Sequence, residues 1–361
     1  MANNDKSKIN LAVIFGGRSS EHEVSLASAK SVLKALSGDK YNTIPVAITK
    51  KGNWLIGAKG GEYLRLHAKS AGKENAISLE SSQSLVTSKN NDEKNLSGFM
   101  EGEISGGIDL VLPILHGAYG EDGRIQGMLD MLGIPYVFSG VLAHALAMNK
   151  PKAKINVKNA GVTVAAERLL YDGENYDAEK IISELSLPLV IKPAELGSSV
   201  GIAIAKDKKS LEKGIADAFR YGRTVMLEKY IAGREFTVAV MGTDTPEALP
   251  VIEIIPKISD FYDYKAKYEE GGSEHVCPAD IPDNIRAKMQ AYAVASFKAI
   301  GCRDLARADF IWSGEDDVIY FIELNTIPGM TATSLAPEAA RAAGLDFTAF
   351  LDKLIAGAII Q

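Results

Sequence analysis

Short apolar runs alternate with stretches of helical periodicity in the first part of the chain, and this alternation limits the possible folds more than any other feature. Residues 11–15 form an apolar run that ends in a Gly-Gly-Arg-Ser-Ser loop, and helical periodicity follows from Glu23 to Leu36. Strands that alternate with helices in this way predict a parallel sheet covered on both faces. Further strands of this sheet are predicted at residues 44–48, 110–115 and 136–138.

The pattern changes twice further along the chain. A helix at 152–160 and three short strands after it predict a smaller second domain. After residue 234, several strands, a long helix at 283–300, a hairpin and terminal helices predict a third domain of mixed α+β type. Residues 68–107, rich in Ser, Gly, Asn and Lys, are expected to form a surface insertion. We therefore expect domains at residues 1–146, 147–232 and 233–361.

Composition narrows the classes of function. The 361 residues, 46% hydrophobic and 24% charged, can bury sizeable cores in two or three domains. A net charge of −6 gives no sign of the basic patch that a nucleic-acid backbone requires. Apolar runs too short to cross a bilayer, and an N-terminus without a signal-peptide core, make the cytoplasm the expected location. Two cysteines, Cys277 and Cys302, provide neither a disulfide framework nor zinc spacing.

Three side chains that can bind a metal ion lie at the ends of two predicted strands. Asp309 precedes the apolar run 310–312, while Glu323 and Asn325 follow the run 318–322, and the Ser-Gly-Glu-Asp-Asp segment between the runs predicts a hairpin. Glu323 and Asn325 are two residues apart, so both point to one face of their strand. Such hard oxygen ligands suit Mg²⁺, which usually binds one or two carboxylates together with water and substrate phosphates.

Arg307, two residues before Asp309, adds a fixed cation for a developing phosphate charge. Taken alone, the Arg307–Asp309 segment or the Glu323–Asn325 segment could also be the solvated edge of a hairpin with ordinary surface charges. The two halves together, followed by Thr-Ile-Pro-Gly-Met-Thr at 326–331, are much more specific.

A second candidate site is a glycine-serine loop at 197–201 that follows Lys192 at a strand end. Glycines let backbone N–H groups approach phosphate oxygens, the hydroxyls of Ser198 and Ser199 donate further hydrogen bonds, and the lysine neutralises charge. The loop is not a Walker A motif, and a Gly-Ser loop alone is more often a simple turn. Lys192 and a further lysine at Lys150 favour the phosphate interpretation.

At 226–231 we expect a strand that runs into a linker. One interpretation is that Glu228 and backbone groups there meet an adenine edge while Glu235 reaches a ribose. The alternative is a plain interdomain hinge, and both interpretations are compatible because nucleotide sites commonly form at domain interfaces.

Three more segments carry candidate substrate residues. His116 lies in a glycine-acid loop after a buried strand, where open α/β sheets bind ligands, and we expect the glycines to expose it to a cleft. The acidic pair around His22 opens the first helix, either as helix-dipole charges or as partners for a substrate ammonium. The aromatic segment 261–268, with Lys267 and Tyr268, is either a mobile lid or an exposed loop.

Taken together, these motifs resemble the D-alanine–D-alanine ligases of the ATP-grasp superfamily over nearly the whole chain. The resemblance implies a three-domain ATP-grasp architecture, α/β and α+β, with an N-terminal parallel α/β domain. It also implies that ATP phosphorylates a first D-alanine to an acyl phosphate, which the amine of a second D-alanine attacks, for peptidoglycan precursor synthesis. Two Mg²⁺ ions, or Mn²⁺, would assist, and a cytoplasmic homodimer without nucleic-acid or membrane partners is expected.

The resemblance assigns each site residue a role. Glu23 would bind the first ammonium, linked to Ser198 and Tyr268, and His116 would lie near the substrate. Arg307 and the Gly329 N–H would stabilise the tetrahedral intermediate. The remaining roles are phosphate binding by Lys150, Lys192, Ser198 and Ser199; adenosine binding by Glu228, Lys229, Ile231 and Glu235; metal binding by Asp309, Glu323 and Asn325; and placement of the second D-alanine by Lys267, Ser334 and Leu335.

Glu195 departs from the family pattern beside the phosphate-loop glycine, and the sequence leaves its effect open. The tyrosine lid favours a peptide product over an ester, whereas D-serine as second substrate is harder to separate from D-alanine. Two rival interpretations remain: another ATP-grasp carboxylate–amine ligase, or a nucleotide-binding regulator without activity. The presence of all expected metal and phosphate ligands argues against the regulator.

Overall fold

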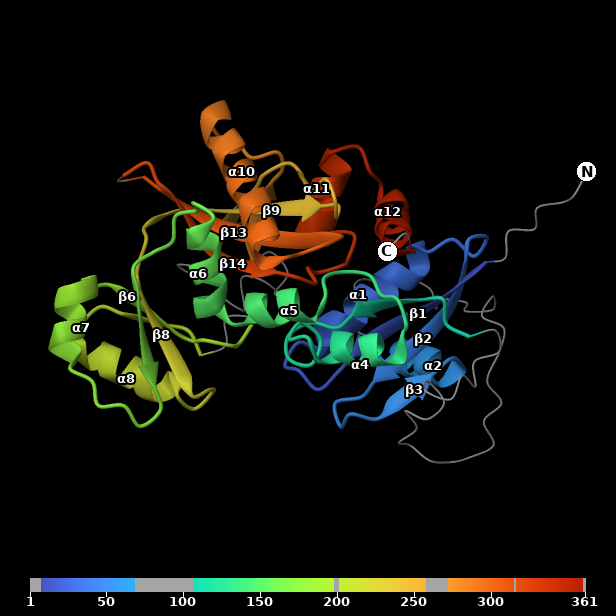
Figure 1. The fold of residues 1–361 in the computed structure, drawn as a ribbon, viewed down its shortest axis with the longest axis horizontal. Coiled ribbons are helices and arrows are strands. Elements are labelled where there is room, and N and C mark those ends of the chain that lie inside the picture. The colour runs from blue at the N-terminus through green and yellow to red at the C-terminus, as the bar shows by residue number, and fades with distance from the viewer. Residues whose placement is uncertain (1–7, 69–106, 198–200, 258–271, 315, 360–361) are drawn as a thin grey trace, which may run out of the picture.

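The computed structural model describes residues 8–68, 107–197, 201–257, 272–314 and 316–359. The predictions for Ser198, Ser199, Lys267 and Tyr268, and those for nearly all of the insertion at 68–107, lie outside the described residues. The described chain forms three sheets, which occupy three parts of the molecule in Figure 1.

The N-terminal sheet has the strand order β3-β2-β1-β4. Strands β1 (Ile9–Gly16), β2 (Tyr41–Ile48) and β4 (Leu110–Ile114) run parallel, as the alternation of strands and helices predicts. The sheet is nevertheless mixed, because the short edge strand β3 (Trp54–Ile56) pairs antiparallel with β2. The strand expected at 136–138 reduces to a single bridge between Tyr136 and Val111. The helices of this part are α1 (His22–Ala35), α2 (Ala58–His67) and α4 (Arg124–Leu132).

The central sheet is antiparallel, with the order β5-β8-β6-β7. Helix α8 (Lys208–Ala218) packs on β6 and β7, and α7 (Ala178–Leu185) packs on α8. This part has a hydrophobic core of its own, which includes Ile181, Leu211 and Leu227. Its strands are β5 (Glu167–Tyr171), β6 (Leu189–Pro193), β7 (Ala203–Ala205) and β8 (Thr224–Lys229).

The C-terminal sheet is antiparallel and includes the expected hairpin, β13 (Leu305–Ser313) and β14 (Ile319–Asn325). Helix α10 (Asp283–Ile300) has the predicted bounds, because Asp283 stands in its first turn and Gly301 ends it in the left-handed conformation. The other strands are β9 (Gly233–Met241), β10 (Glu247–Ala248), β11 (Ile252–Pro256) and β12 (Ser273–Val276).

Helices α5 (Val141–Met148) and α6 (Lys150–Asn159) pack against the C-terminal sheet. Ala153 and Val157 of α6 lie in the same hydrophobic cluster as Phe310 of β13. Asn149 caps α6 by accepting a hydrogen bond from the Lys152 N–H, and proline occupies the first turn. A helix within the proposed central domain thus packs on the C-terminal sheet, and the domain boundaries themselves stay a prediction.

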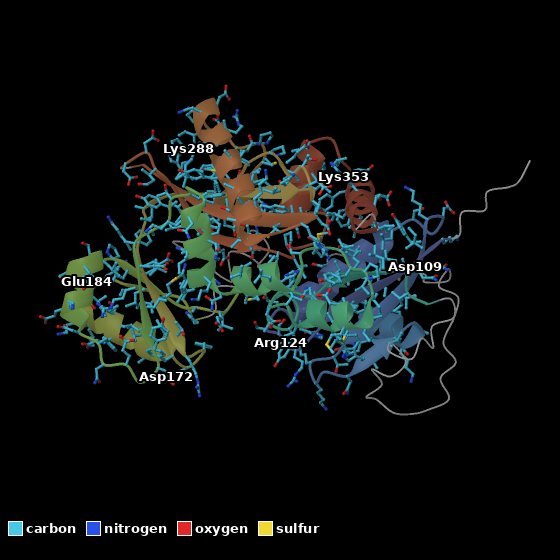
Figure 2. The ribbon with its side chains drawn as sticks, viewed as in Figure 1. Asp109, Arg124, Asp172, Glu184, Lys288 and Lys353 are labelled. Carbon is cyan, nitrogen blue, oxygen red and sulfur yellow. The ribbon has the colours of Figure 1, made fainter. Side chains whose placement is uncertain are left out.

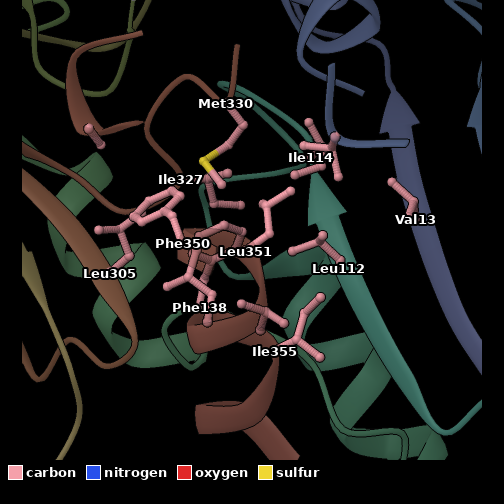
Figure 3. Packing of buried hydrophobic residues seen from close by; sticks show 14 of the residues in the cluster. Val13, Leu112, Ile114, Phe138, Leu305, Ile327, Met330, Phe350, Leu351 and Ile355 are labelled. Carbon is pink, nitrogen blue, oxygen red and sulfur yellow. The ribbon is translucent and has the colours of Figure 1, made fainter. Parts of the chain in front are cut away.

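The N-terminal sheet and the C-terminal helices share one hydrophobic core. Side chains of β1 and β4, among them Val13 and Leu112, pack in one cluster with α12 (Phe347–Ile359) and with the segment after β14 (Figure 3). Helix α11 (Leu335–Ala342) joins the same cluster. The loops that follow β4 and β14 are therefore held next to each other.

Charged side chains of both signs lie at the periphery of all three parts, for example those of Arg124, Asp172, Glu184, Lys288 and Lys353 (Figure 2). Within the described ranges, no helix is both long enough and apolar enough to cross a membrane.

Candidate active site

The β13–β14 hairpin brings the three expected metal ligands together. Its register pairs Asp309 with Glu323 and Arg307 with Asn325. The Asn325 Nδ2 donates to Asp309 Oδ2 at 3.0 Å, and the Thr237 hydroxyl donates to Asp309 Oδ1 at 2.6 Å. Two carboxylates and an amide oxygen therefore gather at one end of the hairpin.

Each of these carboxylates already has a cation beside it. Arg307 donates to both oxygens of Asp309, at 2.9 Å each, and Lys150 Nζ lies 3.3 Å from Glu323 Oε2. A bidentate arginine–carboxylate pair has a well-defined geometry, so Arg307 is held in a fixed direction.

The donor set fits Mg²⁺ that also binds a phosphate. In the part of the chain that the structure describes, no group of three or more His, Cys, Asp or Glu side chains is arranged to hold a metal. Asp309, Glu323 and Asn325 are thus too few for a closed protein site. They match an ion that completes its coordination with water and nucleotide phosphates.

A pocket lies between the central sheet and the hairpin, and all the expected nucleotide residues that the structure describes line it. The central part contributes Lys192, Glu228 and the linker after β8, whereas α6 and the hairpin contribute the other wall. Apolar side chains such as Ile202 and Ile311 complete the lining, as is usual where a flat base binds. The predicted residues in the lining are Lys150, Lys192, Glu228, Lys229, Ile231, Glu235, Asp309 and Glu323.

The Lys192–Glu228 pair in this pocket is deeply buried. Lys192 and Glu228 are each 5% exposed, and one carboxylate oxygen of Glu228 pairs with Lys192. Burial lowers the pKa of Lys192 well below its usual value, and the nearby Lys154 and Lys150 charges act in the same direction. A buried charge is costly unless it is paired, and each of these lysines has a carboxylate partner.

Lys154 also belongs to this cluster and is not among the residues predicted from the sequence. It is 2% exposed, pairs with the second oxygen of Glu228, and lies 4.0 Å from Glu167 Oε2. Burial lowers the pKa of Lys154 to about 8. A signal was present in the sequence: Lys154 follows Lys150 by four residues in α6, which places both on one helix face.

The structure places the two carboxylates at the start of the first helix in different surroundings. Glu23 has a half-exposed side chain that pairs with Lys50 at 2.7 Å. Glu21, at 8% exposure, instead lies against the loops: a Cβ added at Gly117 would lie 2.3 Å from its Oε2, and one at Gly197 would lie 3.2 Å away. Gly197 begins the predicted phosphate loop, so Glu21 rather than Glu23 is beside it. The two residues differ in direction because only Glu21 precedes the helix.

The expectation that glycines expose His116 to a cleft is wrong, because its ring is buried at 4% exposure. Nδ1 donates to the Ile327 carbonyl at 3.0 Å, and the Ser28 hydroxyl donates to Nε2 at 3.1 Å. Burial lowers the pKa of His116, which favours this neutral form. His116 therefore joins the loop after β4 to the loop after β14.

The loop after β14 places Gly329 next to Ser334. A Cβ at Gly329 would lie 2.9 Å from the Ser334 hydroxyl, which also accepts the Thr331 N–H at 3.1 Å. Ser334 precedes α11, whose N-terminal N–H groups favour an anion. Leu335 is 6% exposed, so its side chain packs in the core.

Glu195, the departure from the family pattern, is not among the residues that line the pocket. Its exposed carboxylate accepts a hydrogen bond from the Asn149 side chain at 2.6 Å. It thus contacts the residue that caps α6.

Comparison with known proteins identifies the family. Residues 10–139 match the family model described as D-ala D-ala ligase N-terminus, and residues 157–356 match that described as D-ala D-ala ligase C-terminus. The chain belongs to the D-alanine–D-alanine ligase family. Enzymes of this family are ATP-dependent ligases that use D-alanine, generally with Mg²⁺, in peptidoglycan synthesis.

Individual relatives agree with this membership over nearly their full length. The D-alanine–D-alanine ligase of Acetivibrio thermocellus is 41% identical over 97% of this chain and 95% of its own. The structure of the VanG D-Ala:D-Ser ligase from Enterococcus faecalis has a TM-score of 0.78 at 34% identity, covering 97% of this chain and 99% of its own. The structure of the D-alanine–D-alanine ligase from Coxiella burnetii has a TM-score of 0.77 at 27% identity, and the match covers 98% of this chain and 96% of its own. The expected ATP-grasp fold class is confirmed.

Proposed function

We propose that this protein joins two D-alanines into D-alanyl-D-alanine through an acyl phosphate, with release of ADP and phosphate. The observation that carries the proposal is the meeting of two sets of residues. The buried lysines and the carboxylates of the hairpin form a nucleotide pocket. The charge of Arg307 on the same hairpin acts on Glu121 and His116, which hold Ile327 in the loop that carries Gly329.

In the first step, a carboxylate oxygen of D-alanine takes the γ-phosphoryl group of ATP, and ADP leaves. Lys150 and Lys192 bind phosphate oxygens, with the Ser198–Ser199 loop as a further predicted contact. Lys229, Ile231 and Glu235 contact the adenosine. Two Mg²⁺ ions held by Asp309, Glu323 and Asn325 would supply positive charge against the phosphates and the transferred group.

In the second step, the amine of the second D-alanine attacks the acyl carbon, loses a proton, and expels phosphate. Arg307 and the Gly329 N–H stabilise the oxyanion of the tetrahedral intermediate. The Ser334 hydroxyl, the Leu335 backbone N–H and the predicted lid residue Lys267 bind the carboxylate of this second D-alanine. Glu21, in place of Glu23, binds the ammonium of the first D-alanine, and Tyr268 with Ser198 would close the lid over it.

Phosphate release tests this proposal. Purified protein with ATP and Mg²⁺ is expected to release phosphate with D-alanine and not with L-alanine, and mass spectrometry should detect D-alanyl-D-alanine. Turnover that is equal with L-alanine, or absent with D-alanine, would contradict it.

Competition with D-serine and D-lactate tests the second substrate. We expect the dipeptide of two D-alanines to dominate over the mixed dipeptide and the ester. D-serine is included in this competition because one similar structure is that of a D-Ala:D-Ser ligase. The homodimer, the cytoplasmic location and the use of Mn²⁺ stay predictions.

A further inference from the structure

The peptide unit of Ile327 is held on both sides by one loop of the N-terminal part. Its N–H donates to Glu121 Oε1 at 2.9 Å, and its carbonyl accepts from His116 Nδ1 at 3.0 Å. Glu121 and His116 both lie in the loop that follows β4. We name this arrangement, Glu121 and His116 around Ile327, the Ile327 clamp.

The loop that carries the clamp is itself rigid. The second oxygen of Glu121 accepts the Gly117 N–H at 2.8 Å, and the Glu121 N–H donates to the Gly117 carbonyl at 2.8 Å. Gly117 has a φ of +71°, and any side chain there would clash with the carboxylate of Glu21. The Glu121 carboxylate thus binds a backbone N–H of its own loop and a backbone N–H of the loop after β14.

The clamped segment is also fixed from its other side. The Ile327 side chain is 1% exposed and lies in the shared core with Ile114 and Met330 (Figure 3). The Met330 N–H donates to the Ser28 hydroxyl at 3.3 Å, and that hydroxyl in turn donates to His116 Nε2. The backbone is therefore held at Ile327 and again at Met330.

Only one backbone donor lies between these two fixed points. Pro328 has no N–H, so the N–H of Gly329 is the single one between those of Ile327 and Met330. Its direction follows from the two fixed residues on either side.

The charges of two groups that the proposed reaction uses act on the Glu121 carboxylate. Burial raises the pKa of Glu121 to about 8, and the nearby Glu21 carboxylate acts in the same direction. The N–H donors of Gly117 and Ile327 and the charge of Arg307 oppose this rise. Gly117, which donates to Glu121, also adjoins Glu21, because a Cβ at Gly117 would lie 2.3 Å from Glu21 Oε2; Glu121 is thus close to the predicted ammonium ligand.

We propose that Glu121 is a positioning residue that, through the Ile327 clamp, directs the Gly329 N–H toward the tetrahedral intermediate. The inference rests on the proposed function, in which Gly329 contacts that intermediate. Because the second step needs this contact and phosphoryl transfer does not, loss of the clamp slows attack by the amine more than formation of the acyl phosphate.

The test is the ratio of dipeptide formed to phosphate released in Glu121→Gln. The amide keeps one acceptor oxygen, but its NH₂ group cannot accept the second N–H. An acyl phosphate that is not attacked by the amine hydrolyses, so we expect the ratio to fall below that of the unsubstituted protein. We also expect kcat for dipeptide formation to fall by about tenfold or more, while KM for ATP stays within about twofold.

Asp122→Asn is the matched control in the same loop. Asp122 also accepts a loop N–H, that of Tyr119 at 2.7 Å, but neither hydrogen bond of the clamp involves it. We expect its dipeptide-to-phosphate ratio to be unchanged. If circular dichroism shows that Glu121→Gln does not fold, Glu121→Asp, whose shorter side chain cannot hold both N–H groups, is measured in the same way.

The outcomes separate the two proposals. A fallen ratio in the Glu121 variant, with an unchanged ratio in the control, supports the clamp. An unchanged ratio in the Glu121 variant overturns the inference alone, even if kcat falls, because a merely structural role lowers both products together. No D-alanine-dependent phosphate release by the unsubstituted protein overturns the proposed function and this inference with it.

Discussion

At the scale of single residues, the choice between two carboxylates two positions apart carries the most consequence for substrate binding. Glu21 lies beside Gly117 and Gly197, whereas Glu23 pairs with Lys50 at the surface. We expect Glu21→Gln to lower kcat/KM for D-alanine by about a hundredfold, because a buried charge-assisted hydrogen bond to an ammonium is lost.

Glu23→Gln is the control for this prediction and should retain activity within about threefold, because an exposed ion pair contributes little. Steady-state kinetics with varied D-alanine measures both variants. A larger loss in Glu23→Gln would return the ammonium-binding role to Glu23.

Lys154 is the second residue whose role depends on its surroundings. Its removal leaves one oxygen of the buried Glu228 without its partner, while Lys192 still pairs with the other oxygen. We expect Lys154→Met to lower the free energy of unfolding by about 1–3 kcal/mol and to weaken ATP binding. Urea unfolding and nucleotide titration measure the two effects.

Lys152→Met is the matched control, since Lys152 lies on the same helix with an exposed side chain. It should change neither quantity. Equal effects in the two lysine variants would show that the Lys154–Glu228 pair has no special role.

Glu323 tests the metal site of the hairpin. Glu323→Gln removes one of two carboxylates from the predicted Mg²⁺ ligands, and we expect turnover to fall by more than about a hundredfold, with a higher Mg²⁺ requirement. Far-UV circular dichroism should be unchanged, because the side chain lies at the end of β14. Normal turnover at low Mg²⁺ would remove the metal interpretation.

At the scale of elements, α12 connects the C-terminal end of the described chain to the N-terminal sheet. Leu351 is 1% exposed in the shared core (Figure 3), and Tyr41 of β2 donates to Asp352 Oδ1 at 2.7 Å. We expect Leu351→Ala to lower the free energy of unfolding by about 2–5 kcal/mol, because it leaves a cavity in this core. Lys353→Ala, exposed on the same helix, should change it by less than about 0.5 kcal/mol. Urea unfolding compares the two variants, and equal losses would contradict the shared core.

The elements themselves were largely predictable from periodicity. The hairpin and helix α10 follow from local patterns, which are strong over these lengths. The antiparallel edge strand β3 was not predicted, because three residues are too few for a recognisable alternation. The segment expected as a strand at 136–138 forms only one β-bridge, because an apolar run indicates that residues are buried more reliably than it indicates that they pair with a neighbouring strand.

At the scale of the whole molecule, the N-terminal and C-terminal parts share a core, whereas the central sheet has its own. Polar contacts reinforce the first junction: Arg303 Nε donates to the Phe138 carbonyl at 2.7 Å, and the Phe138 N–H donates to Asp304 Oδ2 at 2.8 Å. The nucleotide pocket lies where the separate central part meets helix α6 and the C-terminal sheet.

His144 makes the stability of this assembly depend on pH. Its buried ring pairs with the Thr326 hydroxyl at 2.6 Å, and burial, with a contribution from the Arg303 charge, lowers its pKa to about 3. The unfolded chain binds this proton near pH 6.5 and the native state does not, so stability falls as the pH drops from about 6.5 to 3. The slope contributed by His144 is about 1.4 kcal/mol per pH unit.

His144→Gln removes this titration. The free energy of unfolding, measured by urea at several pH values, should therefore fall less steeply with acid in the variant than in the unsubstituted protein. Parallel curves for the two proteins would contradict a neutral buried His144.

The sequence by itself determined the order of the elements, the hairpin and the positions of Asp309, Glu323, Lys150 and Lys192, because strand alternation and short-range spacing depend on neighbouring residues. Only the tertiary structure decided which carboxylate of the first turn faces the loops, that His116 is buried, and that Glu121 holds Ile327. Those contacts join residues up to 211 positions apart, and their geometry depends on how separate sheets pack. No local pattern records that packing.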